Sequence, residues 1–217
     1  MRTLDEVIEF VRERTAPDAV PLAPEIVVHQ ASELTPLWHA TAAELAGWDD
    51  SPFWAFPWAG GQALARYVLD HPEIVRARSV ADFATGSGMV AIAALRAGAG
   101  HVLALDVDPF CEAAVRLNAA LNGVAPEFRG GDAIDAALPG VEVLLAGDVF
   151  YERSLAARSL AWFRALAARG VRVLAGDAGR TYAPRDGFEV RAAYEVPTTI
   201  EIEDGPLRHA RVLEILP

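Results

Sequence analysis

The chain has 217 residues, of which 53% are hydrophobic and 23% are charged, and its mean hydropathy is slightly positive at +0.21. This composition predicts one soluble, folded domain with a substantial core and argues against disorder as the main state. Thirty acidic residues stand against 19 basic ones, a formal net charge of −11, so the basic surface that nucleic-acid phosphates require is not expected and a cationic partner fits better.

All 19 basic residues are arginine, because the sequence contains no lysine. This excludes a phosphate loop of the Walker type, a Schiff base and a lysine general base. The single Cys111 excludes an internal disulfide framework, and the histidines show no short metal-ligand spacing. The sequence shows neither an apolar run long enough to span a membrane nor a signal sequence. We therefore expect a cytoplasmic, metal-free monomer with neither a membrane nor a nucleic acid as partner.

The N-terminal segment begins with a helix signal. Thr3 and Glu6 have the spacing of a capping box, and the apolar residues that follow recur at helical intervals, so residues 4–14 are expected to form an amphipathic helix. Prolines after residue 16 end this helix. A short strand is predicted over 25–30 and a second helix or turn region over 36–48.

Alternating strands and helices are predicted from residue 79 onward, which is typical of a buried parallel sheet. The predicted strands cover residues 79–83, 101–106, 127–130, 141–147 and 171–176, and the predicted helices cover 89–97, 109–121 and 154–168. Too few residues follow the fifth strand for a helical crossover, so the final strands, 189–196 and 208–216, are expected to pair antiparallel at a sheet edge. We expect residues 1–50 to form an arm packed on a domain of residues 51–217.

The sharpest local feature is a glycine-containing turn between a predicted strand and the next helix, in the run Asp82-Phe83-Ala84-Thr85-Gly86-Ser87-Gly88. Such a turn lets a ligand approach bare backbone. It also fits the G-x-G-x-x-A fingerprint of dinucleotide-binding proteins, and Asp106 stands where a ribose-binding carboxylate belongs. An NAD-binding oxidoreductase is therefore one interpretation.

Electrostatics favours a different cofactor. Asp82 would face a dianionic pyrophosphate unfavourably, whereas the sulfonium and amino groups of S-adenosylmethionine are cationic. Asp106 would hold the ribose, and Asp132, after the next strand, stands where adenine N6 could donate to it. Three acids at successive strand ends favour S-adenosylmethionine, with S-adenosylhomocysteine as the product. The alternative is that these acids are only turn formers and helix caps.

Several runs together resemble one family. They are Pro52-Phe53-Trp54-Ala55-Phe56-Pro57-Trp58-Ala59-Gly60-Gly61-Gln62-Ala63-Leu64, the Asp82 turn, Leu105-Asp106-Val107-Asp108-Pro109, Gly147-Asp148-Val149-Phe150-Tyr151 and Gly176-Asp177-Ala178-Gly179-Arg180. They are similar to the seven-β-strand protein lysine methyltransferases, and most similar to the electron transfer flavoprotein β-subunit lysine methyltransferase family. The resemblance spans about residues 50–217. It departs from the family at Ala84, where glycine is usual, and at Ala59 and Ala178, where proline is expected.

The resemblance implies an α/β fold, with a doubly wound, mostly parallel seven-stranded sheet of the class I S-adenosylmethionine-dependent methyltransferase type and an N-terminal helical and strand arm. It implies a protein-lysine N-methyltransferase whose substrate is the electron transfer flavoprotein β-subunit. Methylation of another protein or of a small molecule on the same fold is the alternative.

The resemblance also implies roles for individual residues. Asp148 and Tyr151 are the candidate catalytic residues, and Asp148 is expected to bind and align the substrate amine. Trp54 and Phe150 are expected to line the acceptor channel, and Arg180 either binds substrate or anchors a loop. The expected cofactor contacts are Trp58, Gly60, Asp82, Ala84, Gly86, Ser87, Gly88, Asp106, Asp132 and Gly147.

Overall fold

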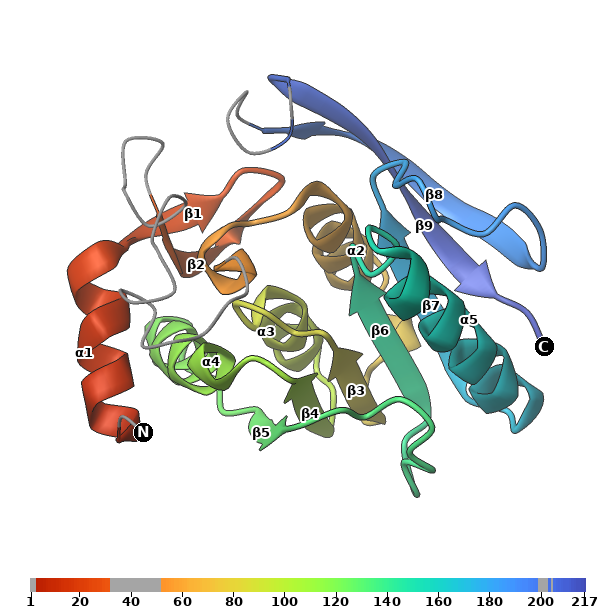
Figure 1. Cartoon of the computed structure of the whole chain (residues 1–217), viewed down its shortest axis with the longest axis horizontal. Coiled ribbons are helices and arrows are strands. Elements are labelled where there is room, and N and C mark those ends of the chain that lie inside the picture. Colours follow the sequence, from red (N-terminus) through yellow and green to blue (C-terminus); the bar gives the residue numbers. More distant parts are fainter. Residues whose placement is uncertain (1–2, 32–51, 199–202, 204) are drawn as a thin grey trace.

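The computed structural model describes residues 3–31, 52–198, 203 and 205–217. Figure 1 shows a twisted central sheet with helices on both of its faces. The helix or turn region predicted over 36–48 lies outside the described residues. Within them, no helix is both long and apolar enough to cross a bilayer.

Seven strands of the described chain form the central sheet, in the order β5-β4-β3-β6-β7-β9-β8. Their bounds are β3 (Ser79–Phe83), β4 (His101–Asp106), β5 (Glu127–Gly130), β6 (Val143–Gly147), β7 (Arg172–Asp177), β8 (Phe188–Pro197) and β9 (Leu207–Ile215). β9 runs antiparallel to β7 and β8, and the other neighbours are parallel. The mostly parallel seven-stranded sheet and the antiparallel pair at its edge are therefore confirmed.

Side chains of the central strands alternate between two cores, which is the consequence of a period of two along a strand. In β3, Val80 joins a core with α2 (Ala59–Asp70), α3 (Met89–Arg96) and α4 (Pro109–Leu121), while the adjacent Ala81 joins a second core with α5 (Arg153–Ala168) on the opposite face. Both faces are covered, as the doubly wound fold class predicts.

Helix α2 has no counterpart among the helices predicted from the sequence. It begins with Ala59, Gly60 and Gly61, and glycine is among the weakest helix formers. Its N-cap, Trp58, makes no side-chain capping hydrogen bond, so neither a cap nor a strong helix former marks where the helix begins. α2 packs against α3, β7 and β9 and covers the sheet beside the end of β6.

The N-terminal segment packs on α4. The capping box of Thr3 and Glu6 is present at the start of α1 (Leu4–Arg14), and the Phe10 ring lies 5.3 Å from the Phe110 ring. After α1, β1 (Ala16–Val20) and β2 (Ala23–Gln30) form a hairpin that the sequence predicted only in its second strand. The β2 backbone donates to Asn118 and Asn122 of α4. Division of the chain into an arm and a domain stays a prediction.

Candidate functional site

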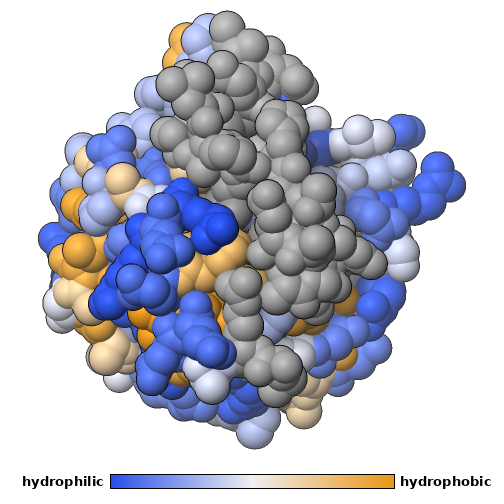
Figure 2. Space-filling view, turned by 60° about the vertical axis from the view of Figure 1, so that its left-hand side comes forward, coloured by the Kyte–Doolittle hydropathy of each residue, from blue (hydrophilic) through white to orange (hydrophobic). Residues whose placement is uncertain are grey.

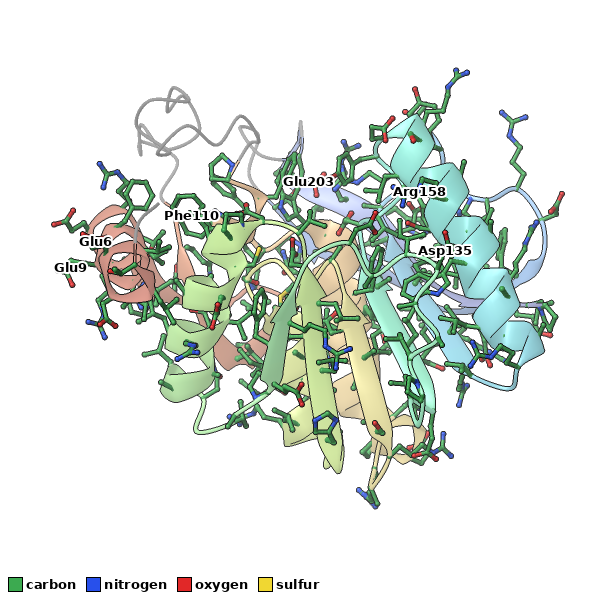
Figure 3. The ribbon with its side chains drawn as sticks, turned by 60° about the horizontal axis from the view of Figure 1, so that its bottom comes forward. Glu6, Glu9, Phe110, Asp135, Arg158 and Glu203 are labelled. Carbon is green, nitrogen blue, oxygen red and sulfur yellow. The ribbon has the colours of Figure 1, made fainter. Side chains whose placement is uncertain are left out.

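A cavity of about 530 Å³ opens at the carboxyl ends of β3, β4 and β6. The chain order reverses between β3 and β6, which is where open α/β sheets bind ligands. The volume lies in the usual range for small-molecule sites. Figure 3 shows Phe110, Glu203 and Arg158, from separate parts of the chain, on the same side of the molecule as these strand ends.

Most of the predicted site residues meet at this cavity, from positions up to 126 residues apart in the chain. Those that line it are Trp54, Trp58, Asp82, Ala84, Gly86, Ser87, Asp106, Asp132, Gly147, Asp148, Tyr151 and Arg180. Gly60, Gly88 and Phe150 are not among the lining residues. Within the described chain, no group of three or more His, Cys, Asp or Glu side chains is placed to hold a metal ion.

The turn after β3 forms the floor of the cavity. Ala84 and Gly86 have φ values of 53° and 52°, a left-handed conformation that costs a residue with a Cβ about 1 kcal/mol. This explains why a glycine is usual at the Ala84 position. Gly88, also left-handed, packs toward Val115 of α4 instead of lining the cavity, where a Cβ would approach the Val115 side chain to 3.1 Å. Gly88 therefore shapes the turn, and its direct contact with the cofactor stays a prediction.

Asp82 ties this turn to α3. Its carboxylate is 1% exposed and accepts hydrogen bonds from the Thr85 hydroxyl and from the backbone N–H of Ala91. Burial raises the pKa of Asp82 to about 7, although these two hydrogen bonds oppose the change. Asp82 thus organises the turn as well as bordering the cavity.

Asp106 and Asp132 border the cavity from the ends of the next two strands. Asp106 accepts from the backbone N–H groups of Gly86 and Asp108, at 2.9 and 3.0 Å, and so joins the turns after β3 and β4. Asp132 pairs with Arg158 at 2.7 Å and accepts from the Ile134 N–H at 3.0 Å. The hydrogen bond from Arg158 holds the pKa of Asp132 below its usual value. Both acids therefore act as turn formers in addition to facing the cavity.

Four glycines let α2 approach the ends of β6 and β7 closely. A Cβ on Gly176 would overlap the Gly60 carbonyl group, and one on Gly147 would lie 2.8 Å from the Gly61 Cα. This approach brings the Gly61 N–H to 2.8 Å from Oδ2 of Asp148. Gly60 therefore serves the close packing of α2, and its contact with the cofactor stays a prediction.

The aromatic residues divide between core and cavity. Phe150 is fully buried in the core beneath α5, 6.5 Å from the Phe163 ring, so the expectation that it lines the acceptor channel is wrong. Tyr151, the next residue, is 49% exposed and lies 5.3 Å from the Phe53 ring. Trp58 donates from its indole nitrogen to the Phe53 carbonyl oxygen at 2.9 Å. The exposed Tyr151 and the partly buried Trp58 are the aromatic groups at the cavity mouth.

Trp54 borders the cavity from a more buried position. It is 1% exposed and stacks on Phe110, with the ring centroids 6.0 Å apart and the planes 9° from parallel. Beneath it, Cys111 is buried at the start of α4, and burial raises the pKa of its thiol well above the usual value, so the thiol stays protonated.

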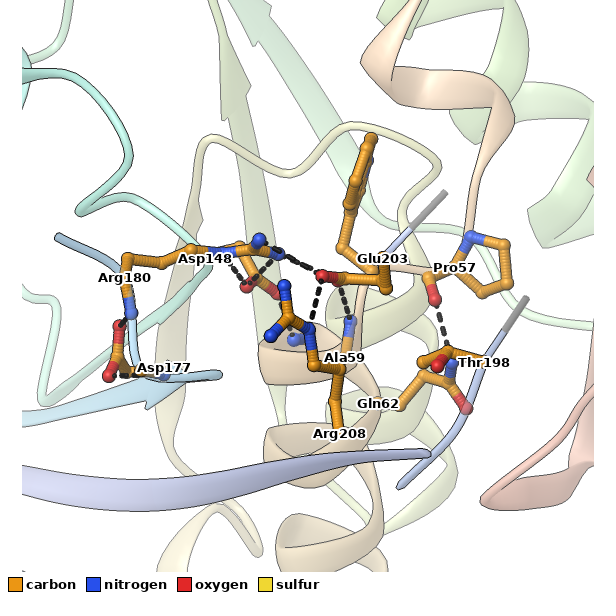
Figure 4. A network of polar contacts seen from close by, with 12 residues as sticks. Pro57, Ala59, Gln62, Asp148, Asp177, Arg180, Thr198, Glu203 and Arg208 are labelled. Atoms are coloured by element: carbon orange, nitrogen blue, oxygen red, sulfur yellow. Dashed lines mark hydrogen bonds and ion pairs between the residues drawn. The ribbon is translucent and has the colours of Figure 1, made fainter. Parts of the chain in front are cut away.

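A buried charge network surrounds Asp148, as Figure 4 shows. Asp148 is 8% exposed and has a left-handed φ of 54°. Its Oδ1 accepts a hydrogen bond from Nε of Arg180 at 2.9 Å and forms an ion pair with Nη2 at 2.8 Å. Burial raises the pKa of Asp148 to about 6, while Arg180 opposes the rise. Asp148 is thus a buried carboxylate at the cavity wall, and Arg180 contacts it from within the same chain.

Sequence reasoning missed Glu203, which is 2% exposed and holds the other side of Arg180. Its carboxylate accepts from Nη1 and Nη2 of Arg180 at 3.0 and 2.7 Å and from the Ala59 N–H at 3.1 Å. No local pattern marks Glu203, because its partners are distant in the sequence. Asp177, fully buried, accepts from the Arg180 backbone N–H at 3.2 Å and fixes the turn that carries the arginine.

The chain is similar to proteins of known activity. Residues 62–141 match the family model of ribosomal protein L11 methyltransferase (PrmA). The chain is 39% identical over 173 residues to the electron transfer flavoprotein beta subunit lysine methyltransferase of Xenopus laevis, covering 79% of this chain and 70% of the relative. It is 34% identical over 202 residues to the protein of that name from Mus musculus, covering 90% of this chain and 78% of the relative.

A solved structure shares the fold. Magnesium protoporphyrin IX methyltransferase from Synechocystis, with bound S-adenosylmethionine, superposes with a TM-score of 0.52 at 16% identity, over 72% of this chain and 80% of that one. At this identity the likeness supports the fold assignment, a class I methyltransferase sheet, and not the substrate.

Proposed function

Because the chain belongs to the electron transfer flavoprotein β-subunit lysine methyltransferase family, we propose that its own substrate is the β-subunit of an electron transfer flavoprotein. The protein is an S-adenosylmethionine-dependent protein-lysine N-methyltransferase. The relatives do not favour the alternatives, an NAD-binding oxidoreductase or methylation of another acceptor. The buried Asp148 carboxylate at the cavity wall is the main support for the proposal that a lysine side chain, the methyl acceptor, enters there.

The residues at the cavity fit S-adenosylmethionine, which supplies an electrophilic methyl group. The left-handed turn of Ala84 and Gly86 exposes backbone, and carboxylates from three strand ends border the cavity. In this arrangement Asp106 would hold the ribose and Asp132 the adenine end, while Trp58 and Gly147 border the end nearer Asp148.

For methyl transfer, the site beside Asp148 must bind the substrate amine in its neutral form. A lysine side chain has a reference pKa near 10.4, so deprotonation at pH 7 costs about 4 to 5 kcal/mol. The nitrogen lone pair forms the new bond to the methyl carbon as the carbon–sulfur bond breaks, and the proton of the amine leaves to water. We propose that Asp148 accepts a hydrogen bond from the amine and aligns it, with Tyr151 and Trp58 beside the entering side chain.

The formal charge of −11 supports a basic segment as the binding partner and opposes nucleic acid. Hydrophilic residues border the apolar surface at the centre of the face shown in Figure 2. We propose further that the protein acts as a cytoplasmic monomer without a membrane partner.

The test is methylation of purified electron transfer flavoprotein with isotope-labelled S-adenosylmethionine, followed by mass spectrometry of its lysines. Because the sequence contains no lysine, every methyl-lysine belongs to the substrate. Label on the β-subunit is expected, and it should accumulate at least about tenfold more slowly with Asp148→Asn. A flavoprotein that stays unlabelled while another component of the same cell extract is methylated would show that the substrate is wrong.

Cofactor selectivity has its own measurement. Calorimetry is expected to show micromolar binding of S-adenosylhomocysteine and no binding of NAD. The reverse result would contradict the assignment as a methyltransferase.

A further inference from the structure

Two groups of the described chain donate hydrogen bonds to Asp148. Arg180 Nε donates to Oδ1, and the Gly61 N–H donates to Oδ2. Nη2 of Arg180 forms an ion pair with Oδ1 at 2.8 Å. A carboxylate offers about four positions for hydrogen-bond donors, and Asp148 borders the cavity. The carboxylate therefore has acceptor capacity for an N–H donor from the cavity.

Arg180 lies between the two carboxylates of the network around Asp148. The carboxylates of Asp148 and Glu203 both contact the Arg180 guanidinium, and Arg208 Nε lies 3.4 Å from Glu203. Burial opposes the charge of Arg180, but Asp148 and Glu203 outweigh this effect and raise its pKa. Arg180 therefore stays charged and offsets the negative charge of the carboxylates that it contacts.

Other charged groups of the described chain lie around the network. Asp177 lies behind Arg180 and is 3.9 Å from Arg211 of β9, and the N-terminus of α2 directs its N–H groups at Asp148 and Glu203. The remaining charged groups at the cavity come from the ends of β3, β4 and β5 and from α5: Asp82, Asp106, Asp108, Asp132 and Arg158.

We propose that Arg180 is a positioning residue that selects the protonation state of the substrate amine: by neutralising Asp148, it makes the site bind the neutral amine in preference to the ammonium. This inference rests on the proposed function, in which a lysine amine reaches Asp148. An unpaired carboxylate would hold the ammonium and so raise the pKa of the amine, which opposes methyl transfer. The pair of Asp148 and Arg180 keeps the hydrogen-bond acceptor and removes most of that attraction.

The two sides of Arg180 give opposite predictions. Arg180→Met removes one positive charge from the network, which favours binding of an ammonium. Glu203→Gln removes one negative charge, which disfavours an ammonium relative to the unchanged protein. A purely structural role of either residue would weaken activity without moving its pH dependence in opposite directions.

The first experiment measures single-turnover methylation of electron transfer flavoprotein from pH 6 to 10. The methylation rate is expected to rise with pH as the amine loses its proton. In Arg180→Met this rise is expected to move to higher pH by at least about one unit, which lowers the rate at pH 7 about tenfold. In Glu203→Gln the rise is expected to move to lower pH. A rise that keeps its pH in Arg180→Met, or that moves to higher pH in Glu203→Gln, would overturn the proposal. If Arg180→Met fails to fold, shown by loss of S-adenosylhomocysteine binding, the sign of the Glu203→Gln shift decides.

The second experiment does not depend on the protein substrate. It measures the affinity of n-butylamine for the protein saturated with S-adenosylhomocysteine, from pH 8 to 10, above the titration of Asp148. Selective binding of the neutral amine makes the affinity rise about tenfold per pH unit. The rise is expected in the unchanged protein and in Arg180→Lys, which restores the charge, and is expected to be lost in Arg180→Met.

The two experiments separate the inference from the proposed function. A butylamine affinity that rises steeply with pH, except in Arg180→Met, supports the inference even if the flavoprotein remains unmethylated. An unmethylated flavoprotein would then contradict only the proposed substrate. The same pH dependence in the unchanged protein and in Arg180→Met, or no binding of butylamine to the unchanged protein, would refute the inference.

Discussion

Replacing Gly176 by alanine is expected to separate α2 from the end of β7 and to destabilise the protein. The added Cβ would overlap the Gly60 carbonyl oxygen, lie 2.7 Å from the Gly60 carbonyl carbon and meet the Leu64 Cβ at 3.0 Å. Two of these three atoms belong to the backbone, so no side chain can rotate away to relieve the overlap. The helix must shift, and Gly61, which donates to Asp148, lies at the point that moves.

The expected cost is at least that of overpacking a core, about 1 to 3 kcal/mol. For a chain of this length, the midpoint of thermal unfolding falls by about 2 to 4 °C per kcal/mol, so we expect a decrease of about 2 to 12 °C. Thermal unfolding followed by circular dichroism is the assay.

Gly130→Ala is the matched control, because a Cβ there would meet nothing closer than 3.7 Å and the residue lies in β5 without a left-handed φ. Both substitutions reduce the conformational entropy of the unfolded chain equally, so the control should unfold at or slightly above the temperature of the unchanged protein. If Gly176→Ala unfolds within about 1 °C of Gly130→Ala, the reasoning about the close approach is refuted.

Three other substitutions test the cavity. Asp148→Asn is expected to leave S-adenosylhomocysteine affinity nearly intact and to lower turnover at least about tenfold, because the amine loses its aligning carboxylate; full activity would remove Asp148 from the mechanism. Asp106→Ala is expected to weaken S-adenosylhomocysteine binding at least about tenfold in calorimetry, because the ribose and the Gly86 N–H lose an acceptor, and unchanged affinity would argue against that contact. Asp82 has a folded-state pKa of about 7 against a usual 3.8, so the folded state binds the proton more tightly and its stability falls as pH rises between these values. Urea unfolding should show a smaller loss of stability from pH 5 to pH 7 in Asp82→Asn than in the unchanged protein, and equal losses would contradict the shifted pKa.

Prediction of the fold succeeded where a residue pattern is local. The strand over 79–83, the turn that follows it and the helix from residue 89 are signalled by adjacent residues, and the structure has β3 and α3 at those positions. α2 was missed because it begins with Ala59, Gly60 and Gly61 and has no capping side chain. The hairpin strand β1 was missed because Pro17 was taken only as a helix stop, although an edge strand accommodates proline.

The acids that the sequence predicted at strand ends lie at one cavity. Parallel strands end at one edge of a sheet, so Asp82, Asp106 and Asp132 had to come together wherever those strands paired, and their contacts with the cofactor stay a prediction. Phe150 lies in the core and not at the cavity, because sequence alone does not give the side to which the residues after β6 point. The close packing of Gly60 was not foreseen, because a glycine that admits another backbone looks the same in a sequence as one that admits a ligand.

The sequence by itself determined the chemistry that the chain can offer: arginine as its only long-chain base, acids at the ends of successive strands, and a turn that exposes backbone. These features depend on residue type and short spacing, which the sequence states directly. The tertiary structure alone decided which charges meet. Asp148, Arg180 and Glu203 lie in three separate segments, and they pair only because the packing of α2 against β6 and β7 buries them together, where unpaired charges would be too costly.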